Sequence, residues 1–225
     1  MDAATTTSWL AAEPVVERID LRRGSWVDVV RGLVPEAGGV YRDLLGGVPW
    51  EGSRVFRYER WIEEPRLGGW QSGGDRHPAL VQVSDWLARR YRVDFDGVAL
   101  AKYRHGADSV GFHRDREMRW LEDTVIGVLT FGARRPFLMR PIGERRSAHD
   151  DDMVDDLGRT FDLSPAGGDL IVMGGRCQAD WLHAVPKVTG GAVVGPRISA
   201  QYRWTSRKGR PDIQPGFRAP RLYSR

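Results

Sequence analysis

The sequence is poor in cysteine and lysine and has no long apolar run. Its 225 residues include one cysteine, Cys177, which excludes an intramolecular disulfide framework and a cysteine-rich zinc site. No stretch approaches the roughly 20 apolar residues that a membrane-spanning helix needs. The first residues lack the basic start and apolar core of a signal peptide. These absences predict a cytoplasmic protein with no membrane contact, and the length predicts one large domain or two small ones.

The positive charge is carried almost entirely by arginine. Basic residues number 34 against 30 acidic ones, so the formal net charge is only +4, and just three of the basic residues are lysines. Arginine binds phosphates and carboxylates through its planar guanidinium, although a GC-rich genome produces the same bias. From Arg203 onward the chain is basic, with Asp212 as its single acid. Such a tail is compatible with nucleic-acid binding but does not establish it.

Helical patterns are confined to the first 95 residues. Residues 24–33 and 36–46 have loosely helical spacing, and Pro78 opens a stronger helix over 78–91 with an apolar stripe. Beyond residue 95 the sequence consists of short β-rich runs separated by glycine, proline and aspartate. These runs are 97–104, 109–113, 124–131, 136–140, 158–163, 168–173, 181–185 and 196–204. Such punctuation predicts an all-β sandwich or barrel with helices packed outside.

Two histidines and one aspartate suggest a metal site. His113 and Asp115 are two residues apart in GFHRDRE, so in extended chain their side chains point to the same side. His183 follows 68 residues after Asp115, in WLHAVPK, at the edge of another expected strand. Two imidazoles and one carboxylate form the facial triad that holds non-haem Fe(II) and leaves positions open for cosubstrate and dioxygen. Taken separately, an HxD pair arises by chance and a histidine near a strand end is usually structural.

A pair of arginines points to a dianion. Arg197 and Arg203 lie six residues apart in RISAQYR, so on a strand they share a face with Ser199 and Gln201. Their Cα atoms would be about 20 Å apart, but side chains that lean together can bracket a dicarboxylate such as 2-oxoglutarate. The alternative is a cationic outer face on an edge strand. The intervening apolar residues favour a barrel with a polar interior: Ile198, Ala200 and Tyr202.

The stretch from about Val98 to Trp204 resembles the AlkB family of Fe(II)- and 2-oxoglutarate-dependent dioxygenases. The resemblance rests on the order and spacing of YRHGADSVGFHRDRE, GGDLIVMGGRCQADWLHAVPK and GPRISAQYR, and upstream EEPRLGGW loosely matches the family's nucleotide-recognition lid. It implies a mostly β fold with flanking helices (α+β) built on a double-stranded β-helix, or jelly-roll, core. We expect a helical extension and lid over 1–95, this core over 96–205 and a basic tail over 206–225.

The resemblance also assigns roles to the metal and cosubstrate residues. It implies that His113, Asp115 and His183 ligate Fe(II). Arg197 would pair with the distal carboxylate of 2-oxoglutarate, and Arg203 would act beside the carboxylate that chelates the metal.

Three further positions bear on cosubstrate binding. Tyr103 would add a hydrogen bond, and Ser199 stands at a cosubstrate position that is often asparagine in the family. Ala101 replaces another family asparagine that contacts 2-oxoglutarate, so one hydrogen bond worth roughly 0.5–1.5 kcal/mol is missing.

The substrate residues follow from the same resemblance. Glu117 matches an acid that reads the exocyclic nitrogen of a damaged base, with a solvent-facing acid as the alternative. Arg66 and Trp70 fall where the lid contacts the nucleotide, with core packing as the alternative for Trp70. The implied reaction is oxidative demethylation of N-alkylated bases, such as N1-methyladenine or N3-methylcytosine, in DNA or RNA by a monomeric enzyme. It consumes dioxygen and 2-oxoglutarate and releases formaldehyde, succinate and CO2.

Two other functions remain open from the sequence. One is a small-molecule hydroxylase with the same iron and cosubstrate, and the other is a catalytically silent nucleic-acid-binding module. The metal and cosubstrate residues serve the oxidation itself, so they do not distinguish a nucleic-acid substrate from a small molecule. Glu117, the PRLGGW segment and the basic tail favour nucleic acid, with phosphate contacts expected from Arg60, Arg66, Arg76 and the Arg207–Arg210 segment.

Overall fold

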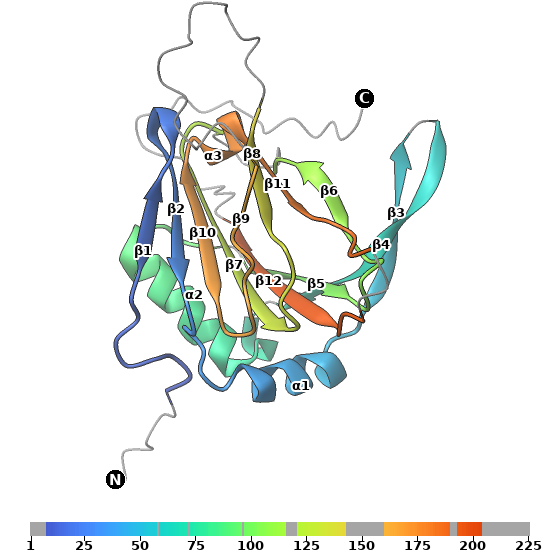
Figure 1. Ribbon diagram of the computed structural model, residues 1–225. Helices are drawn as coiled ribbons and strands as arrows, with labels where there is room; N and C mark the ends of the chain where they lie inside the picture. Colours follow the sequence, from blue (N-terminus) through green and yellow to red (C-terminus); the bar gives the residue numbers. More distant parts are fainter. Residues whose placement is uncertain are drawn as a thin grey trace, which may run out of the picture.

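The computed structural model describes residues 8–57, 59–71, 73–95, 97–115, 121–142, 160–189 and 193–203. Most of its regular structure is antiparallel strand, arranged in two sheets that face each other (Figure 1). The large sheet has eight strands in the order β1-β2-β10-β7-β12-β5-β4-β3. In that order they are β1 (Glu17–Asp20), β2 (Ser25–Val30), β10 (Leu170–Gly175), β7 (Thr124–Gly132), β12 (Arg197–Arg203), β5 (Val98–Tyr103), β4 (Arg60–Gln71) and β3 (Glu51–Arg57).

The small sheet has four strands and lies over the inner face of the large sheet. In spatial order they are β6 (Val110–His113), β11 (Trp181–Val185), β8 (Leu138–Pro141) and β9 (Phe161–Asp162). Both sheets contribute to the hydrophobic core between them, which includes Val128, Ile171, Met173, Met139, Trp181 and Val185. This arrangement is the expected double-stranded β-helix, and the predicted mostly β fold is confirmed.

Two helices pack on the outer face of the large sheet, α1 (Ala37–Gly47) and α2 (Pro78–Tyr91). α2 begins where the Ala79 N–H donates a hydrogen bond to His77 Nδ1 at 3.1 Å, with proline in the first turn. A second core fills the space between helices and sheet, and it includes Leu80, Val83, Leu87, Val98, Leu100, Ile198, Ala200 and Tyr202. Because strand residues alternate between faces, the polar positions of β12 point the other way, toward the small sheet.

The expected positions of most elements are confirmed. The helix predicted over 78–91 matches α2 at both ends, and the pattern at 36–46 corresponds to α1. Each of the eight short β-rich runs overlaps one strand, from β5 to β12 in chain order. The sequence therefore predicted both the helices that cover the sheet and the strands of the core.

The expected helix over 24–33 is wrong. Residues Arg22–Gly24 form a short 3-10 turn, η1, and Ser25–Val30 form β2, which pairs with β1 and β10. The apolar spacing of SWVDVV fits either a helix or a strand that is buried on both faces. Its β-branched valines favour the strand. Asp28 in the middle of β2 is buried but fully paired, because Arg18 donates two hydrogen bonds to its carboxylate at 2.7 and 2.8 Å.

Strands from the first 95 residues extend the large sheet on both sides. β2 pairs with β10, and β4 pairs with β5, while η2 (Gly73–Asp75) connects β4 to α2. The proposed domain boundaries at residues 95 and 205 stay predictions. The basic tail lies outside the described residues. Within the described residues, no helix has the length and apolar character needed to cross a membrane.

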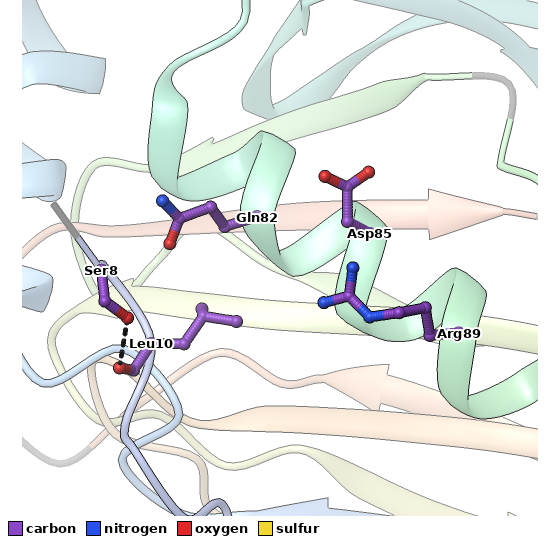
Figure 2. A pocket seen from close by; sticks show the side chains of 5 residues that line it. All are labelled: Ser8, Leu10, Gln82, Asp85 and Arg89. Carbon is purple, nitrogen blue, oxygen red and sulfur yellow. Dashed lines mark hydrogen bonds between the residues drawn. The ribbon is translucent and has the colours of Figure 1, made fainter. Parts of the chain in front are cut away.

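One pocket lies on the outer side of α2, between this helix and the N-terminal segment (Figure 2). It is lined by Ser8, Leu10, Gln82, Asp85 and Arg89. The Trp9 N–H donates to Gln82 Oε1 at 2.8 Å, which fastens the N-terminal segment to the helix. Because α2 and the small sheet cover opposite faces of the large sheet, this pocket is separated from the histidine site by the thickness of the sheet.

Candidate active site

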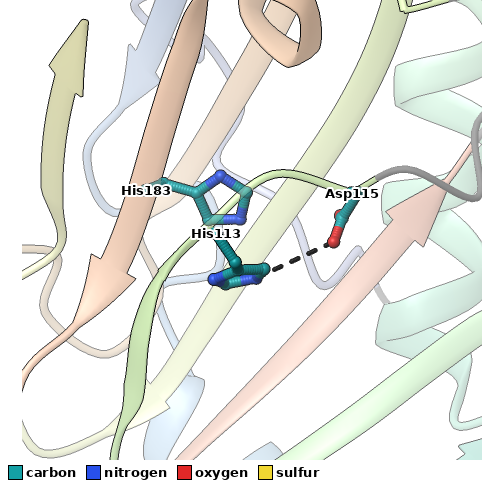
Figure 3. Close-up of side chains that lie close together, drawn as sticks. All are labelled: His113, Asp115 and His183. Carbon is teal, nitrogen blue, oxygen red and sulfur yellow. Dashed lines mark ion pairs between the residues drawn. The ribbon is translucent and has the colours of Figure 1, made fainter. Parts of the chain in front are cut away.

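The two histidines and the aspartate of the predicted metal site come together between β6 and β11. His113 ends β6 and lies directly opposite His183 of β11 in the antiparallel register. Asp115 follows two residues after β6 ends, and the ligand atoms of all three side chains lie within 4.8 Å of one another. Figure 3 shows the two imidazole rings and the carboxylate converging on one point. The arrangement presents three ligand atoms to one side of a divalent cation and leaves its other side open.

Both imidazoles are kept neutral. Burial and, to a smaller extent, the neighbouring His113 together lower the pKa of His183 to about 3. Burial also lowers the pKa of His113. A neutral imidazole has a lone pair available for a metal, so both rings are in the ligating form at neutral pH.

The carboxylate of Asp115 stays ionised although it is buried. Burial by itself raises the pKa of Asp115, but the positive charge of Arg203, the two histidines and a hydrogen bond hold it well below its usual range. That hydrogen bond is donated by Arg203 Nε to Asp115 Oδ2 at 2.8 Å. The donor set is therefore two neutral nitrogens and one anionic oxygen, which suits Fe(II).

Neighbouring groups orient both rings. His113 Nδ1 lies 2.9 Å from the carbonyl oxygen of Gly111. Because a carbonyl only accepts, Nδ1 carries the proton and Nε2 is left to face the metal. Phe137 stacks on the ring of His183, with centroids 5.7 Å apart and planes at 12°.

A buried cation lies on the same inner face. Arg197 is fully buried, and its Nη2 donates to Thr130 Oγ1 at 3.0 Å. Its Nε and Nη1 have no hydrogen-bond partner among the described residues. Burial lowers the pKa of Arg197 to about 10, so the side chain is still charged at neutral pH. A buried charge with unpaired donors fits a bound anion, such as the distal carboxylate of 2-oxoglutarate.

A family model described as the 2OG-Fe(II) oxygenase superfamily matches residues 58–203. The chain belongs to this superfamily. The family description names both Fe(II) and 2-oxoglutarate, and this chain provides a fitting group for each. The triad of neutral imidazoles and ionised carboxylate suits the metal. The Arg197 guanidinium, two of whose nitrogens have no partner among the described residues, suits the cosubstrate.

Individual relatives share moderate sequence identity. The chain is 29% identical over 181 residues to alpha-ketoglutarate-dependent dioxygenase alkB homolog 3 of Bos taurus, covering 75% of this chain and 61% of that protein. It is 27% identical over 231 residues to DNA oxidative demethylase ALKBH2 of Arabidopsis thaliana, covering 84% of this chain and 69% of that protein. The chain thus spans about three fifths of the length of the alkB homolog 3 proteins.

Solved structures support the superfamily fold. A prolyl hydroxylase from Trichoplax adhaerens, in complex with a peptide, aligns with a TM-score of 0.54 at 10% identity, covering 80% of this chain and 83% of that chain. A prolyl-4-hydroxylase from Pseudomonas putida aligns with a TM-score of 0.50 at 16% identity, covering 82% and 94%. At these identities the similarity concerns the fold alone.

The remaining cosubstrate residues predicted for this superfamily member line the same inner face. Tyr103 is buried, and its ring centroid lies 5.4 Å from the Arg197 guanidinium. Ser199 is buried and lies opposite Ala101 on one side and Thr130 on the other. These three small side chains form a row beside Arg197, and Ala101 offers no hydrogen bond from that row.

The predicted substrate residues lie on β4 or outside the described residues. Arg66 and Trp70 share the face of β4 that Ala99 and Tyr103 present on β5. Burial is the main cause of the lowered pKa of both histidines, and the positive charge of Arg66 lowers it as well, which indicates that Arg66 lies near the triad. Trp70 is 55% exposed, which contradicts the alternative of core packing. Glu117 falls outside the described residues.

Two buried residues near the site were missed from the sequence. Arg135 is fully buried and donates to the carbonyls of four residues in the surrounding loops: His105, Gly106, Asp108 and Pro186. Gln178 is fully buried and accepts a hydrogen bond from the Asp115 N–H at 2.8 Å. No motif singles out either residue, because both act through backbone groups that come together only in the fold.

Proposed function

We propose that the chain is an Fe(II)- and 2-oxoglutarate-dependent dioxygenase that removes methyl groups from N-alkylated bases in DNA or RNA. The observation that carries the proposal is the triad of His113, Asp115 and His183 beside Arg197, a buried cation with two nitrogens that lack partners within the described ranges. The similarity to alkB homolog 3 and to DNA oxidative demethylase ALKBH2 supports nucleic acid as the substrate. The enzyme acts as a monomer in the cytoplasm.

The side chains of the site have separate tasks. His113, Asp115 and His183 hold the metal on one face, and Arg203 keeps Asp115 ionised and in place. Arg197 binds the distal carboxylate of 2-oxoglutarate. When bound, Fe(II) and 2-oxoglutarate supply the oxidation of the methyl group by dioxygen, with release of formaldehyde, succinate and CO2.

The substrate side of the proposal rests on β4. The β3–β4 hairpin projects from the end of the large sheet (Figure 1). It carries two exposed indoles, Trp61 and Trp70, and Arg60, which precedes Trp61 in the sequence, is exposed as well. Bases stack on aromatic side chains, and arginines bind the phosphate backbone in a salt-dependent way.

The target methyl group of a duplex is enclosed in the base stack. The enzyme therefore acts on single strands or on a nucleotide flipped out of the helix. Glu117 reads the exocyclic nitrogen of the base, and Arg66 and Trp70 contact the nucleotide. Arg76 and the Arg207–Arg210 segment contribute further phosphate contacts.

The test compares succinate release with three additions under otherwise equal conditions. These are a single-stranded oligonucleotide carrying N1-methyladenine or N3-methylcytosine, the same oligonucleotide without the methyl group, and buffer alone. We expect the methylated oligonucleotide to stimulate release above both controls, and expect His183→Ala to abolish it. Equal release with all three additions would favour the alternative, a hydroxylase of a small molecule, because the triad and Arg197 serve either substrate.

A further inference from the structure

Asp115 lies beyond the strand that carries its partner ligand. β6 ends at His113, so the ladder that aligns His113 with His183 does not reach Asp115. Two long-range hydrogen bonds locate it instead. Arg203 donates to its carboxylate, and its own backbone N–H donates to Oε1 of Gln178 at 2.8 Å. Gln178 is thus the group that holds the backbone of this ligand.

The orientation of the Gln178 amide is fixed by this contact. A backbone N–H only donates, so the oxygen Oε1 and not the nitrogen Nε2 faces Asp115. Gln178 is fully buried, and Nε2 has no hydrogen-bond partner in the part of the chain that the structure describes. Gln178 pairs the Asp115 N–H but leaves its own Nε2 unpaired, and an apolar side chain of the same size would exchange one unpaired donor for the other, so the net gain in stability from glutamine is small. Stability alone therefore does not account for glutamine at this position.

The turn that carries Gln178 is itself firmly held. It is α3 (Cys177–Asp180), and Arg176 donates two hydrogen bonds to Asp180 at 2.9 and 3.1 Å. Arg114, between the two ligands of the HxD segment, donates to the carbonyl of Ala179 at 3.1 Å. The turn therefore contacts this segment at two consecutive residues.

The same turn leads directly into the strand of the third ligand. α3 ends at Asp180, and β11 begins at Trp181 and carries His183. The carbonyl of Asp180 also accepts a hydrogen bond from the Ile142 N–H at 2.8 Å, which ties the turn to the end of β8. A displacement of α3 would move Asp115 and His183 relative to each other.

We propose that Gln178 is a positioning residue that sets the place of Asp115 relative to the two imidazoles and thereby the metal affinity of the site. This inference rests on the proposed function, since it takes the triad to be the iron site. Residues that hold metal ligands from behind change metal affinity by about 10- to 100-fold when they are replaced.

The test measures metal affinity and stability of the metal-free protein separately. Co(II) is titrated anaerobically, its visible absorption reports binding, and urea unfolding of the metal-free protein reports stability. Gln178→Met fills the same volume but removes the hydrogen-bond acceptor. Gln178→Glu keeps an acceptor oxygen and adds a buried charge. Cys177→Ala is the control, because it alters the same buried turn without touching Asp115. We expect Gln178→Met to weaken Co(II) binding about 10- to 100-fold with little loss of stability. Gln178→Glu should lose stability but keep the wild-type affinity, and Cys177→Ala should keep the affinity.

A purely structural role predicts a different pattern. Metal affinity would then follow the stability of the metal-free protein across all three variants, and that result would overturn the inference. Wild-type affinity in Gln178→Met would overturn it as well. A wild-type protein that binds no Co(II), or that binds it equally after His183→Ala, would overturn the iron site itself and the proposed function with it.

Discussion

Arg203 and Asp115 are 88 residues apart in sequence, and Arg203 Nε donates a hydrogen bond to Asp115 Oδ2 at 2.8 Å. The same guanidinium also hydrogen-bonds Gln201 on its own strand. This ion pair links the strand that carries Arg197 to the metal triad, so β12 carries both the arginine proposed to bind the cosubstrate and the arginine that pairs with a metal ligand.

Loss of this ion pair makes metal binding more sensitive to acid. In Arg203→Met the pKa of Asp115 rises, because burial then acts without the opposing positive charge. Protons compete with the metal for the carboxylate from a higher pH than in the wild type. Co(II) titrations between about pH 5 and pH 8 should therefore show weaker binding that falls off earlier in the variant. A pH profile parallel to that of the wild type would contradict the role of Arg203.

Replacing Arg197 should stabilise the protein and weaken cosubstrate binding. Arg197 is buried and charged, with two of its nitrogens unpaired in the part of the chain that the structure describes. Arg197→Met removes this charge, so we expect the cosubstrate-free protein to gain roughly 1–4 kcal/mol in free energy of unfolding. Affinity for 2-oxoglutarate should fall on the order of 10- to 100-fold, because a charge-assisted hydrogen bond is lost. Urea unfolding and calorimetric titration measure the two effects, and a destabilised variant with normal affinity would refute the assignment.

The metal-free fold should lose stability as the pH falls below about 6.5. His183 has its pKa lowered to about 3 in the fold, so the unfolded chain takes up its proton first. The contribution of His183 to the free energy of unfolding is fully present above pH 6.5 and is on the order of 2 kcal/mol smaller at pH 5. Asp115 titrates below this window, since its pKa lies under the ordinary value. Urea unfolding of wild type and His183→Gln should show a steeper pH dependence in the wild type, and identical slopes would contradict the buried neutral imidazole.

The exposed indole of Trp70 offers a test of the nucleotide contact. A Cβ atom added at Gly97 would lie 2.5 Å from Cζ2 of Trp70, so Gly97→Ala displaces the indole ring without removing it. We expect Trp70→Ala to weaken binding of a methylated single strand by about 1–3 kcal/mol, and Gly97→Ala to weaken it in the same direction. Fluorescence anisotropy measures binding, and Co(II) affinity is the control that should not change. Unaltered anisotropy curves for both variants would exclude stacking by Trp70.

The sequence predicted those parts of the fold and site that depend on local pattern. Alternation in β12 separates Arg197 and Ser199 from Ile198 and Ala200, and the structure places these two sets on opposite faces. The spacing of His113 and Asp115 likewise brings both toward one point. The sequence pattern predicts a helix where β2 lies, because a strand that is buried on both faces loses the alternation that identifies a strand.

Other features of the site depend on contacts between distant segments. Arg135 and Gln178 bind backbone groups of loops that come together only in the folded protein. Composition and spacing carry no sign of such bonds.

The most direct test of the account is mass spectrometry of a single-stranded oligonucleotide that carries one N1-methyladenine or N3-methylcytosine. It is incubated aerobically with the protein, Fe(II), ascorbate and 2-oxoglutarate, beside a reaction without 2-oxoglutarate and one with His183→Ala. The account predicts loss of the methyl group only in the complete wild-type reaction, with formaldehyde and succinate released together. An unchanged oligonucleotide, with succinate still formed, would contradict the proposed nucleic-acid substrate.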